Sequence, residues 1–505
     1  MLHDPVTALC IAWFMGQRRI VGILATLRVP FVQLRLLIET PALWGLALAA
    51  AVLFGLAGLH DRRDRNGDRS APLIEALACG FGVATWLWLL HGGQFPWTEG
   101  DWREEWTFFF AWKQALRDGT MPYHLGTAMQ GTERYFANLQ TPMMPYVAGL
   151  ALVSVKTFLL FHIVVVYIAG FLGAIALRRE LAIGLLPWML FVFIFTLNGH
   201  IISHLSVGHL PWIAYFLMPW VLWSAVRTAR GDSSARNVIT CATVLAAMIL
   251  IGGWHVFVWS LIFMIGTCLA RPAQVVVLVQ IVVLTTLLAA VRLAPGVATF
   301  GTGANTFISG FPTLASLFES LAGTPVRHLL LDQWELDMYV GGAGLMLLGI
   351  GAVPFREVEK RHMNVLLLPS AALIILSFGD VYRDTLFRLP GFVSERVTTR
   401  LLIVPVLWLA LAGAVRFDAW WRHQGSALAL GLWVGGWFLA LQLLLRAHSW
   451  RPHTGPSADL LPAEVLKTLP PEPAYYRAFW IGAAISLATA LAVAAFAYRR
   501  RPFWN

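Results

Sequence analysis

Apolar runs of about 20 residues, long enough to cross a bilayer as helices, fill most of this chain of 505 residues. Inside a bilayer each backbone N–H and C=O group must be bonded within its own segment, so these runs predict helices. Hydrophobic residues make up 58% of the chain and charged residues 13%, against about 25% charged residues in a soluble domain. The sequence therefore predicts an all-α, polytopic transmembrane bundle.

We expect about 12–13 spans, with an error of several residues at each boundary. The segment 141–155 is apolar but short, is interrupted by Pro142 and Pro145, and is expected to form a partial or interfacial helix. The predicted spans are 41–59, 73–92, 157–177, 181–198, 209–226, 237–251, 255–270, 273–292, 338–354, 363–379, 400–415, 426–445 and 477–497.

The breaks between spans alternate in charge, which predicts their orientation. Short breaks rich in Arg and Lys belong in the cytoplasm, so the C-terminus is expected inside and the long loops outside. The long loops are 93–140, 293–337, 380–399 and 446–476. The topology of an N-terminal segment, 1–72, stays open: an odd number of spans puts the N-terminus outside, whereas its early arginines favour the inside. Residues 73–505 form the expected transmembrane module.

The net charge of +10 does not indicate a nucleic-acid partner, because the positive residues flank apolar runs. Cysteines are equally uninformative. Cys10, Cys79, Cys241 and Cys268 lie in or beside apolar runs without paired spacing, so the sequence predicts neither a disulfide framework nor a cysteine zinc site.

The first long loop, 93–140, contains a predicted amphipathic helix. Thr98 stands three residues before Asp101, which is the spacing of a capping box. Trp102 and the aromatic residues after it share one face, and Asp118-Gly119 is a helix stop. A helix of this kind is expected to lie in the membrane interface, with its tryptophans at headgroup depth.

Three acids cluster at the start of this helix. Asp101, Glu104 and Glu105 follow i, i+3 and i+4 spacing, which places them on one side. Acids at a helix N-terminus are favoured by the helix dipole, so ordinary capping accounts for them. The alternative is a general base at the membrane surface, where a hydroxyl acceptor and a lipid-borne donor can meet.

Four stretches in this order resemble the GT-C glycosyltransferase superfamily, and most closely the YfhO-like bacterial membrane proteins and related polyprenyl-phosphate-sugar-dependent transferases. Together they cover most of residues 90–420, and each one is a loose pattern. They are Gly100-Asp101 with its aromatic helix up to Pro122, the segment 208–220, the segment 334–342 and the segment 389–400.

The resemblance implies a GT-C-like bundle in the bacterial cytoplasmic (inner) membrane that moves a sugar from a polyprenyl-phosphate donor to a glycan or lipid acceptor outside the cytoplasm. Asp101 matches the family's first-loop acid and would be the base in an inverting reaction. Many members have a second acid beside the first. Here Gly100 and Trp102 flank Asp101, so an assisting role for Glu99, Glu104 or Glu105 stays open.

Several other polar residues are candidates for substrate binding. Arg396 and Arg400 stand at i and i+4, and their guanidinium groups suit a phosphate, although snorkelling to the interface explains them equally well. Arg327 and His328 form a weaker phosphate candidate. Glu335, with Asp337, could hold a divalent cation or the acceptor sugar, or form a salt bridge with Arg327.

Histidines gather in another short outer break. His200 and His204 have the i, i+4 spacing of zinc ligands, and His209 follows. Because no Glu completes an HExxH motif, we expect a polar lining of the active-site cavity rather than a metal site. His255 is expected to line the same cavity. No cofactor is certain from the sequence.

Two other classes of protein fit the spans. A transporter or flippase for lipid-linked saccharides should carry charged residues and Gly or Pro breaks at mid-span, whereas the predicted spans are nearly free of charge. A non-catalytic membrane scaffold would keep the shape without needing Asp101.

Overall fold

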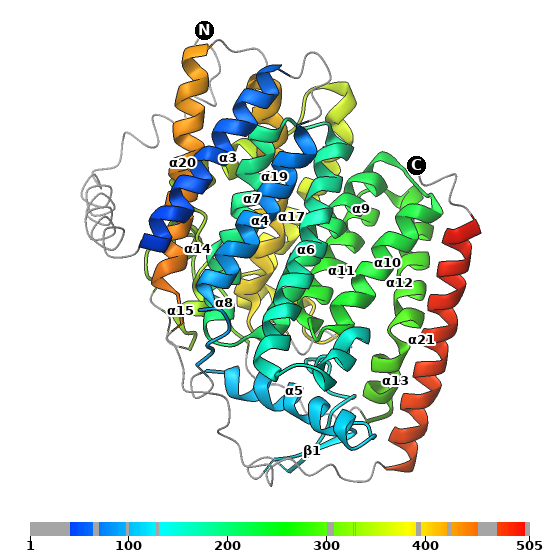
Figure 1. Cartoon of the computed structure of the whole chain (residues 1–505). Coiled ribbons are helices and arrows are strands. Elements are labelled where there is room, and N and C mark those ends of the chain that lie inside the picture. The colour runs from blue at the N-terminus through cyan, green and yellow to red at the C-terminus, as the bar shows by residue number, and fades with distance from the viewer. Residues whose placement is uncertain are drawn as a thin grey trace.

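The computed structural model describes residues 41–63, 70–96, 100–127, 131–299, 308–326, 328, 330–389, 395–421, 426–452 and 472–499, and it is predominantly helical (Figure 1). The α-helices are α3 (Pro41–Arg63), α4 (Ala71–Leu89), α5 (Trp102–Arg117), α6 (Val155–Leu181), α7 (Leu185–Leu197), α8 (Gly199–Ser206), α9 (Met218–Arg230), α10 (Ala235–Leu250), α11 (Trp254–Leu269), α12 (Val275–Leu288), α13 (Ala290–Thr299), α14 (Leu314–Ala322), α15 (Gln333–Leu336), α16 (Gly341–Ala352), α17 (Leu367–Leu376), α18 (Gly379–Thr385), α19 (Ile403–Trp421), α20 (Ser426–Ser449) and α21 (Pro473–Arg499).

Shorter elements connect these helices. The 3-10 turns are η2 (Pro145–Ala151), η3 (Leu210–Leu217), η4 (Pro272–Gln274), η5 (Val358–Leu366) and η6 (Thr398–Leu402). Strands β1 (His124–Thr127) and β2 (Gly131–Arg134) pair antiparallel, with His124 opposite Arg134. This hairpin corrects the all-α expectation for the segment 93–140. The expected surface helix or extra span before residue 41 lies outside the described residues.

Within the described part of the chain, six helical segments are long and apolar enough to cross a membrane: α3, α4, α6, α7 with α8, η6 with α19, and α21. The number rises to eight if two bent pairs each count as one span. Several of the 12–13 expected spans correspond instead to shorter apolar helices, α10, α11 and α16, or to helices broken by turns. Hydropathy measures how apolar a run is and does not detect a bend inside it. This explains why the sequence predicts more full-length spans than the structure contains among the described residues.

The centre of the bundle is formed by α7, which is apolar on all sides and buried along nearly its whole length. A helix of this kind needs neighbours all round, and α3, α19 and α20 pack against it. The outer helices expose apolar side chains such as Val276 of α12 and Leu487 of α21. An apolar exposed surface is what helices that face lipid require.

Glycines allow two of the inner helices to approach closely. A Cβ atom added to Gly351 of α16 would lie 2.0 Å from the carbonyl oxygen of Leu409, and one added to Gly413 of α19 would lie 2.2 Å from that of Leu347. Neither position has room for a side chain. Small residues at such crossings are typical of helix packing in membranes.

Helix α5 lies across one end of the bundle, beside the β1–β2 hairpin (Figure 1), and we refer to this end as the α5 end. As the sequence predicts, the helix begins directly after Asp101 and ends before Asp118-Gly119. Gly119 has a φ of +65°, the left-handed conformation that terminates helices. Trp102, Trp106 and the other aromatic residues of one face are buried against the bundle.

A buried arginine holds the chain after the hairpin in place. Helices α12 and α13 meet at a bend of 80°, and Arg292 follows the bend. Its guanidinium group donates to the carbonyl oxygens of Tyr135 at 3.3 Å, of Thr141 at 2.9 Å and of Asn138. The side chain is fully buried, so these carbonyls replace the water that the charge would otherwise bind.

Replacing Arg292 by Leu should destabilise the protein. The substitution removes the arginine donor of the buried Thr141 carbonyl, whereas the Tyr135 and Asn138 carbonyls keep the Thr141 hydroxyl as a donor. A buried polar group without a partner costs about 1–3 kcal/mol. We expect a fall of several degrees in the thermal unfolding midpoint of the purified protein in detergent. Arg477→Leu is the matched control, because Arg477 is exposed on α21 and donates to the Pro473 carbonyl of the same helix. Equal midpoints for both variants would show that the Arg292 contacts contribute nothing.

Candidate active site

Two glycines bring the start of α5 against the turn that follows α8. Gly100 and Gly208 have φ values of +53° and +94°. A Cβ atom on Gly100 would lie 2.2 Å from the carbonyl oxygen of Val207, and one on Gly208 would lie 2.3 Å from the backbone nitrogen of Trp102. The Asp101 N–H donates to the Val207 carbonyl at 2.8 Å. This backbone contact places Asp101 beside His209.

The Asp101 carboxylate does not cap its helix. Asp101 is the N-cap residue of α5, but its side chain makes no cap hydrogen bond. Instead, its Oδ2 atom lies 2.9 Å from His209 Nε2, and 54% of the side chain is exposed. The hydrogen bond from His209 lowers the pKa of Asp101 below its ordinary value, although partial burial acts in the opposite direction. Thr98, the other half of the expected capping box, lies outside the described residues.

A chain of side chains leads from Asp101 into the protein. The Nδ1 atoms of His209 and His204 lie 2.6 Å apart. His204 Nε2 lies 3.7 Å from Oε2 of Glu335, a residue 131 positions away that belongs to α15. The structure thus brings four of the expected site residues, Asp101, His204, His209 and Glu335, into one cluster at the α5 end of the bundle.

Glu335 and Arg400 form a buried ion pair. Arg400 Nε donates to Glu335 Oε2 at 2.6 Å, and its Nη2 donates to Oε1. Burial alone would raise the pKa of Glu335, but the charge and hydrogen bonds of Arg400 outweigh burial and hold that pKa below its ordinary value. Arg400 is therefore the ion-pair partner of Glu335, a pairing that the sequence analysis did not consider.

A second carboxylate–histidine pair lies nearby. The sequence analysis predicted its histidine as a site residue but not its carboxylate. His255 Nδ1 lies 2.6 Å from Oε1 of Glu395, and Trp259 Nε1 donates to Oε2 at 2.8 Å. The sequence analysis expected His255 to line the same cavity as His204. It did not name Glu395, which directly precedes Arg396 in the sequence, as a candidate. The signals in the sequence were its position directly before Arg396 and its place within the family-like segment 389–400.

Trp212 links the two histidine groups. Its ring centroid lies 5.0 Å from that of His204, 5.2 Å from that of His209 and 5.3 Å from that of His255. The Arg400 guanidinium carbon lies 4.6 Å above the same ring. An aromatic face stabilises a cation at this distance, so Trp212 helps to fix the arginine and packs between the imidazoles.

The two other acids of α5 differ in environment. Glu104 is exposed, and Glu105 is buried. Burial raises the pKa of Glu105 well above its ordinary value, and the charges of Glu104 and Asp101 act in the same direction. The three acids lie close together, and Asp101 combines an accessible carboxylate with a histidine partner.

The remaining residues that the sequence suggested for substrate binding are not part of the chain from Asp101 to Glu335. Arg396 is exposed, and its charge acts on Asp101. His328 accepts from the backbone N–H groups of Leu330 and Leu331, so it orders its own loop. Arg327 lies outside the described residues. Asp337, which follows Glu335 closely in sequence, binds Arg446 instead.

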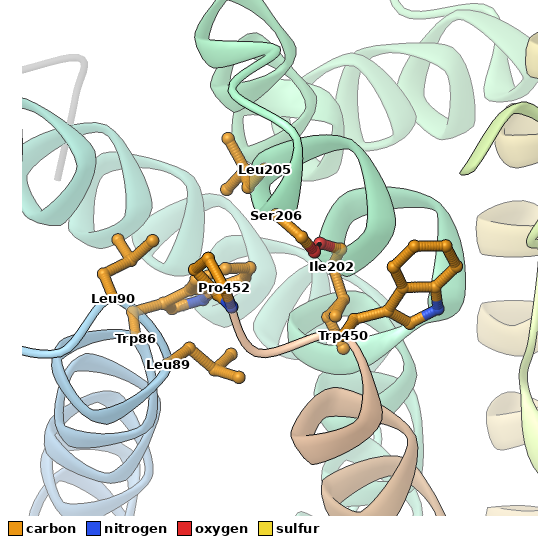
Figure 2. A pocket seen from close by; sticks show the side chains of 8 residues that line it. All are labelled: Trp86, Leu89, Leu90, Ile202, Leu205, Ser206, Trp450 and Pro452. Atoms are coloured by element: carbon orange, nitrogen blue, oxygen red, sulfur yellow. Dashed lines mark hydrogen bonds between the residues drawn. The ribbon is translucent and has the colours of Figure 1, made fainter. Parts of the chain in front are cut away.

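Two cavities among the described residues have largely apolar linings. Figure 2 shows a small apolar cavity between the end of α4, α8 and the segment after α20, lined by Trp86, Leu89, Leu90, Ile202, Leu205, Ser206, Trp450 and Pro452. Its volume of about 10 Å³ holds no more than one water molecule. A groove of about 490 Å³ between α10 and α12 is lined almost entirely by apolar side chains, which cannot act on a polar substrate.

Comparison with protein-family models, with curated proteins and with solved structures finds no match for this chain. Its function must therefore be argued from the site itself.

Replacing Glu105 by Gln should flatten the dependence of stability on pH. The folded state binds the Glu105 proton more tightly than the unfolded state, whose pKa is near the ordinary 4.5. Its contribution to stability is therefore complete below that pH and decreases as the pH rises towards the raised pKa. Glutamine keeps the shape and cannot ionise, so this decrease should disappear.

The measurement is the thermal unfolding midpoint in detergent across about pH 5 to 8. Glu104→Gln is the control, because Glu104 is exposed on the same turn of α5 and should leave the slope unchanged. If Glu105→Gln shows the same slope as the unmodified protein, Glu105 is ionised in the folded state.

Proposed function

We propose that this protein is a membrane glycosyltransferase of the GT-C type. It transfers a sugar from a polyprenyl-phosphate donor to a glycan or lipid acceptor and inverts the anomeric centre. In this proposal the protein lies in the bacterial cytoplasmic membrane with its C-terminus in the cytoplasm, and the α5 end faces the opposite side, where α5 lies in the membrane interface.

The Asp101 carboxylate is the observation that carries the proposal. It is half-exposed at the start of α5, and its Oδ2 atom is held by His209. A general base must be reachable by the hydroxyl group that it deprotonates and must also be held in one orientation. Asp101 meets both conditions at the end of the bundle, where a membrane-borne donor and a polar acceptor can meet.

The proposed reaction needs one base and no acid. The acceptor O–H bond breaks as its proton passes to Asp101, and the acceptor oxygen forms a bond with the anomeric carbon of the sugar. The bond between that carbon and the phosphate oxygen breaks, and its electron pair remains on the lipid phosphate. A direct attack of this kind inverts the configuration at the anomeric carbon.

The departing phosphate requires positive partners, and Arg396 is the best candidate. It is exposed, and its charge reaches Asp101. Arg400 is four residues further on, but its guanidinium group is already engaged by Glu335. In this proposal Arg396 contacts the phosphate directly, and Arg400 contributes its charge from behind.

The distribution of charge favours an enzyme over a transporter. Each of the six candidate spans contains an apolar window of 18 residues with no more than two charged residues. The ionised groups described above gather instead at the α5 end. A transporter that moves a charged substrate needs such groups near the middle of its spans.

Asp101→Asn should abolish sugar transfer. Asparagine keeps the shape of the side chain but cannot accept the proton, and loss of a general base costs about 10²–10⁴-fold in rate. The assay incubates the protein in proteoliposomes with a panel of polyprenyl-phosphate-linked radiolabelled sugars and an extract of envelope glycans and lipids. Asp118→Asn is the matched control, because Asp118 is exposed at the opposite end of α5. Full activity of the Asp101 variant would remove it from the mechanism.

Arg396→Ala should weaken donor binding about tenfold or more, because a charged hydrogen bond to phosphate is worth about 1.5–3 kcal/mol. Binding is measured by titrating polyprenyl phosphate into the detergent-solubilised protein. Arg388→Ala serves as the control, since Arg388 is also exposed and precedes the same span. Equal affinities for the two variants would make Arg396 an interfacial anchor only.

A further inference from the structure

We propose that His204, His209 and Glu335 bind one divalent transition-metal ion of the zinc class. Each of the three residues offers one ligand atom, and these atoms lie within 4.8 Å of one another. Of the i, i+4 pair His200 and His204, His204 is a ligand here, His209 takes the place of His200, and the sequence shows no neighbouring acid. The fold supplies that acid from Glu335, which belongs to a different element.

Unsatisfied ring nitrogens give independent support. His200 and His204 are fully buried, and neither nitrogen of His200 nor Nε2 of His204 has a hydrogen-bond partner in the described structure. A buried polar group without a partner costs about 1–3 kcal/mol. The His204 and His200 ring centroids lie 4.6 Å apart, so the unsatisfied atoms surround one region. With an ion at Nδ1 of His204, the ring proton is on Nε2, which faces Oε2 of Glu335 at 3.7 Å.

The contact between the two histidines is also suited to an ion. Their Nδ1 atoms point at each other across 2.6 Å, so without an ion they must share a single proton. Zinc–nitrogen bonds of about 2.0–2.1 Å in tetrahedral geometry place two ligand nitrogens about 3.3 Å apart. Binding therefore needs the rings to separate by less than about 1 Å, and His209 lies in a turn rather than in a helix.

Asp101 and Arg400 hold two of the three ligands in place. The Nε2–H group of His209 donates to Asp101, which leaves the lone pair on Nδ1. Metal-binding histidines usually donate their other ring nitrogen to a carboxylate in this way. The two hydrogen bonds from Arg400 orient Glu335, and its carboxylate oxygens keep further lone pairs.

The charge of the cluster favours a cation. Among the described residues, the cluster holds three acids, Asp101, Glu335 and Glu395, and one buried arginine, Arg400, so the acids outnumber that arginine by two. His255 is the hydrogen-bonded partner of Glu395, and Arg396 lies exposed outside. One divalent ion balances the excess, although Arg400 lowers the affinity through its own charge.

The ligand types indicate which metal is bound. Two imidazoles and one carboxylate select Zn²⁺, Co²⁺ or a similar first-row ion over Mg²⁺ and Ca²⁺, which prefer all-oxygen sites. Three protein ligands leave a fourth position for water or a substrate oxygen. If the chain transfers a sugar as proposed above, that position lies beside the base and can bind the acceptor hydroxyl.

The experiment measures the metal directly. The full chain without a histidine tag is purified in detergent, incubated with ZnCl₂, desalted and analysed for zinc by mass spectrometry. We expect about one zinc ion per chain. His204→Ala, His209→Gln and Glu335→Gln should each retain less than a tenth of this. His162→Ala is the matched control, because His162 is also fully buried but lies on α6, bonded to Tyr146.

Cobalt supplies a second measurement. Co²⁺ bound in a tetrahedral site gives strong visible absorption bands, which His209→Gln should remove. An unmodified protein that retains neither Zn²⁺ nor Co²⁺ overturns the proposal, and so does equal retention by the unmodified protein and all three ligand variants.

Unfolding midpoints identify variants that fail to fold. If His204→Ala is misfolded, His209→Gln decides the outcome, because His209 lies in the turn and tolerates a polar replacement. Zinc bound without sugar transfer leaves the metal site standing and counts against the proposed function alone. Sugar transfer by a protein that binds no metal supports the proposed function and overturns the metal site.

Discussion

The buried ion pair between Glu335 and Arg400 is the interaction on which the α5 end of the bundle depends. Either charge alone would be very costly to bury, whereas together they satisfy each other through two hydrogen bonds. The pair joins α15 to η6, the turn that opens the long central helix α19. It also fixes the carboxylate behind His204 and the cation above Trp212. Removing one partner would therefore disturb the whole cluster.

The features that depend only on residues close together in the sequence were predicted best. The start of α5 after Asp101, its end before Asp118-Gly119 and the apolar character of the bundle each follow from residues within one short segment. The number of full-length spans did not follow, because the 80° bend between α12 and α13 and the break between α7 and α8 depend on neighbours. The β1–β2 hairpin was missed because its four-residue strands lack a distinct alternation.

The sequence predicted which residues belong to the candidate site, but not which of them contact one another. His204, His209, His255, Glu335 and Arg400 were all singled out by residue type and position, yet the sequence gives no register between segments more than a hundred residues apart. It therefore proposed Arg327, and not Arg400, as a salt-bridge partner of Glu335, and it did not single out Glu395. Pairing in a low-dielectric interior is decided by which opposite charge the packing brings within reach, and that is a property of the fold.

Asp101 and Glu105 show why position on a helix does not by itself assign chemistry. The two acids are one turn apart and were equivalent by spacing. Glu105 points into the bundle, where burial favours its neutral form. Asp101 sits at the junction that Gly100 and Gly208 create, where the backbones touch and His209 can donate to its carboxylate. Glycine at both positions is what allows the close approach, since a side chain at either would push α5 away from the histidines. The chemistry available to Asp101 is thus set by two residues that have no side chain.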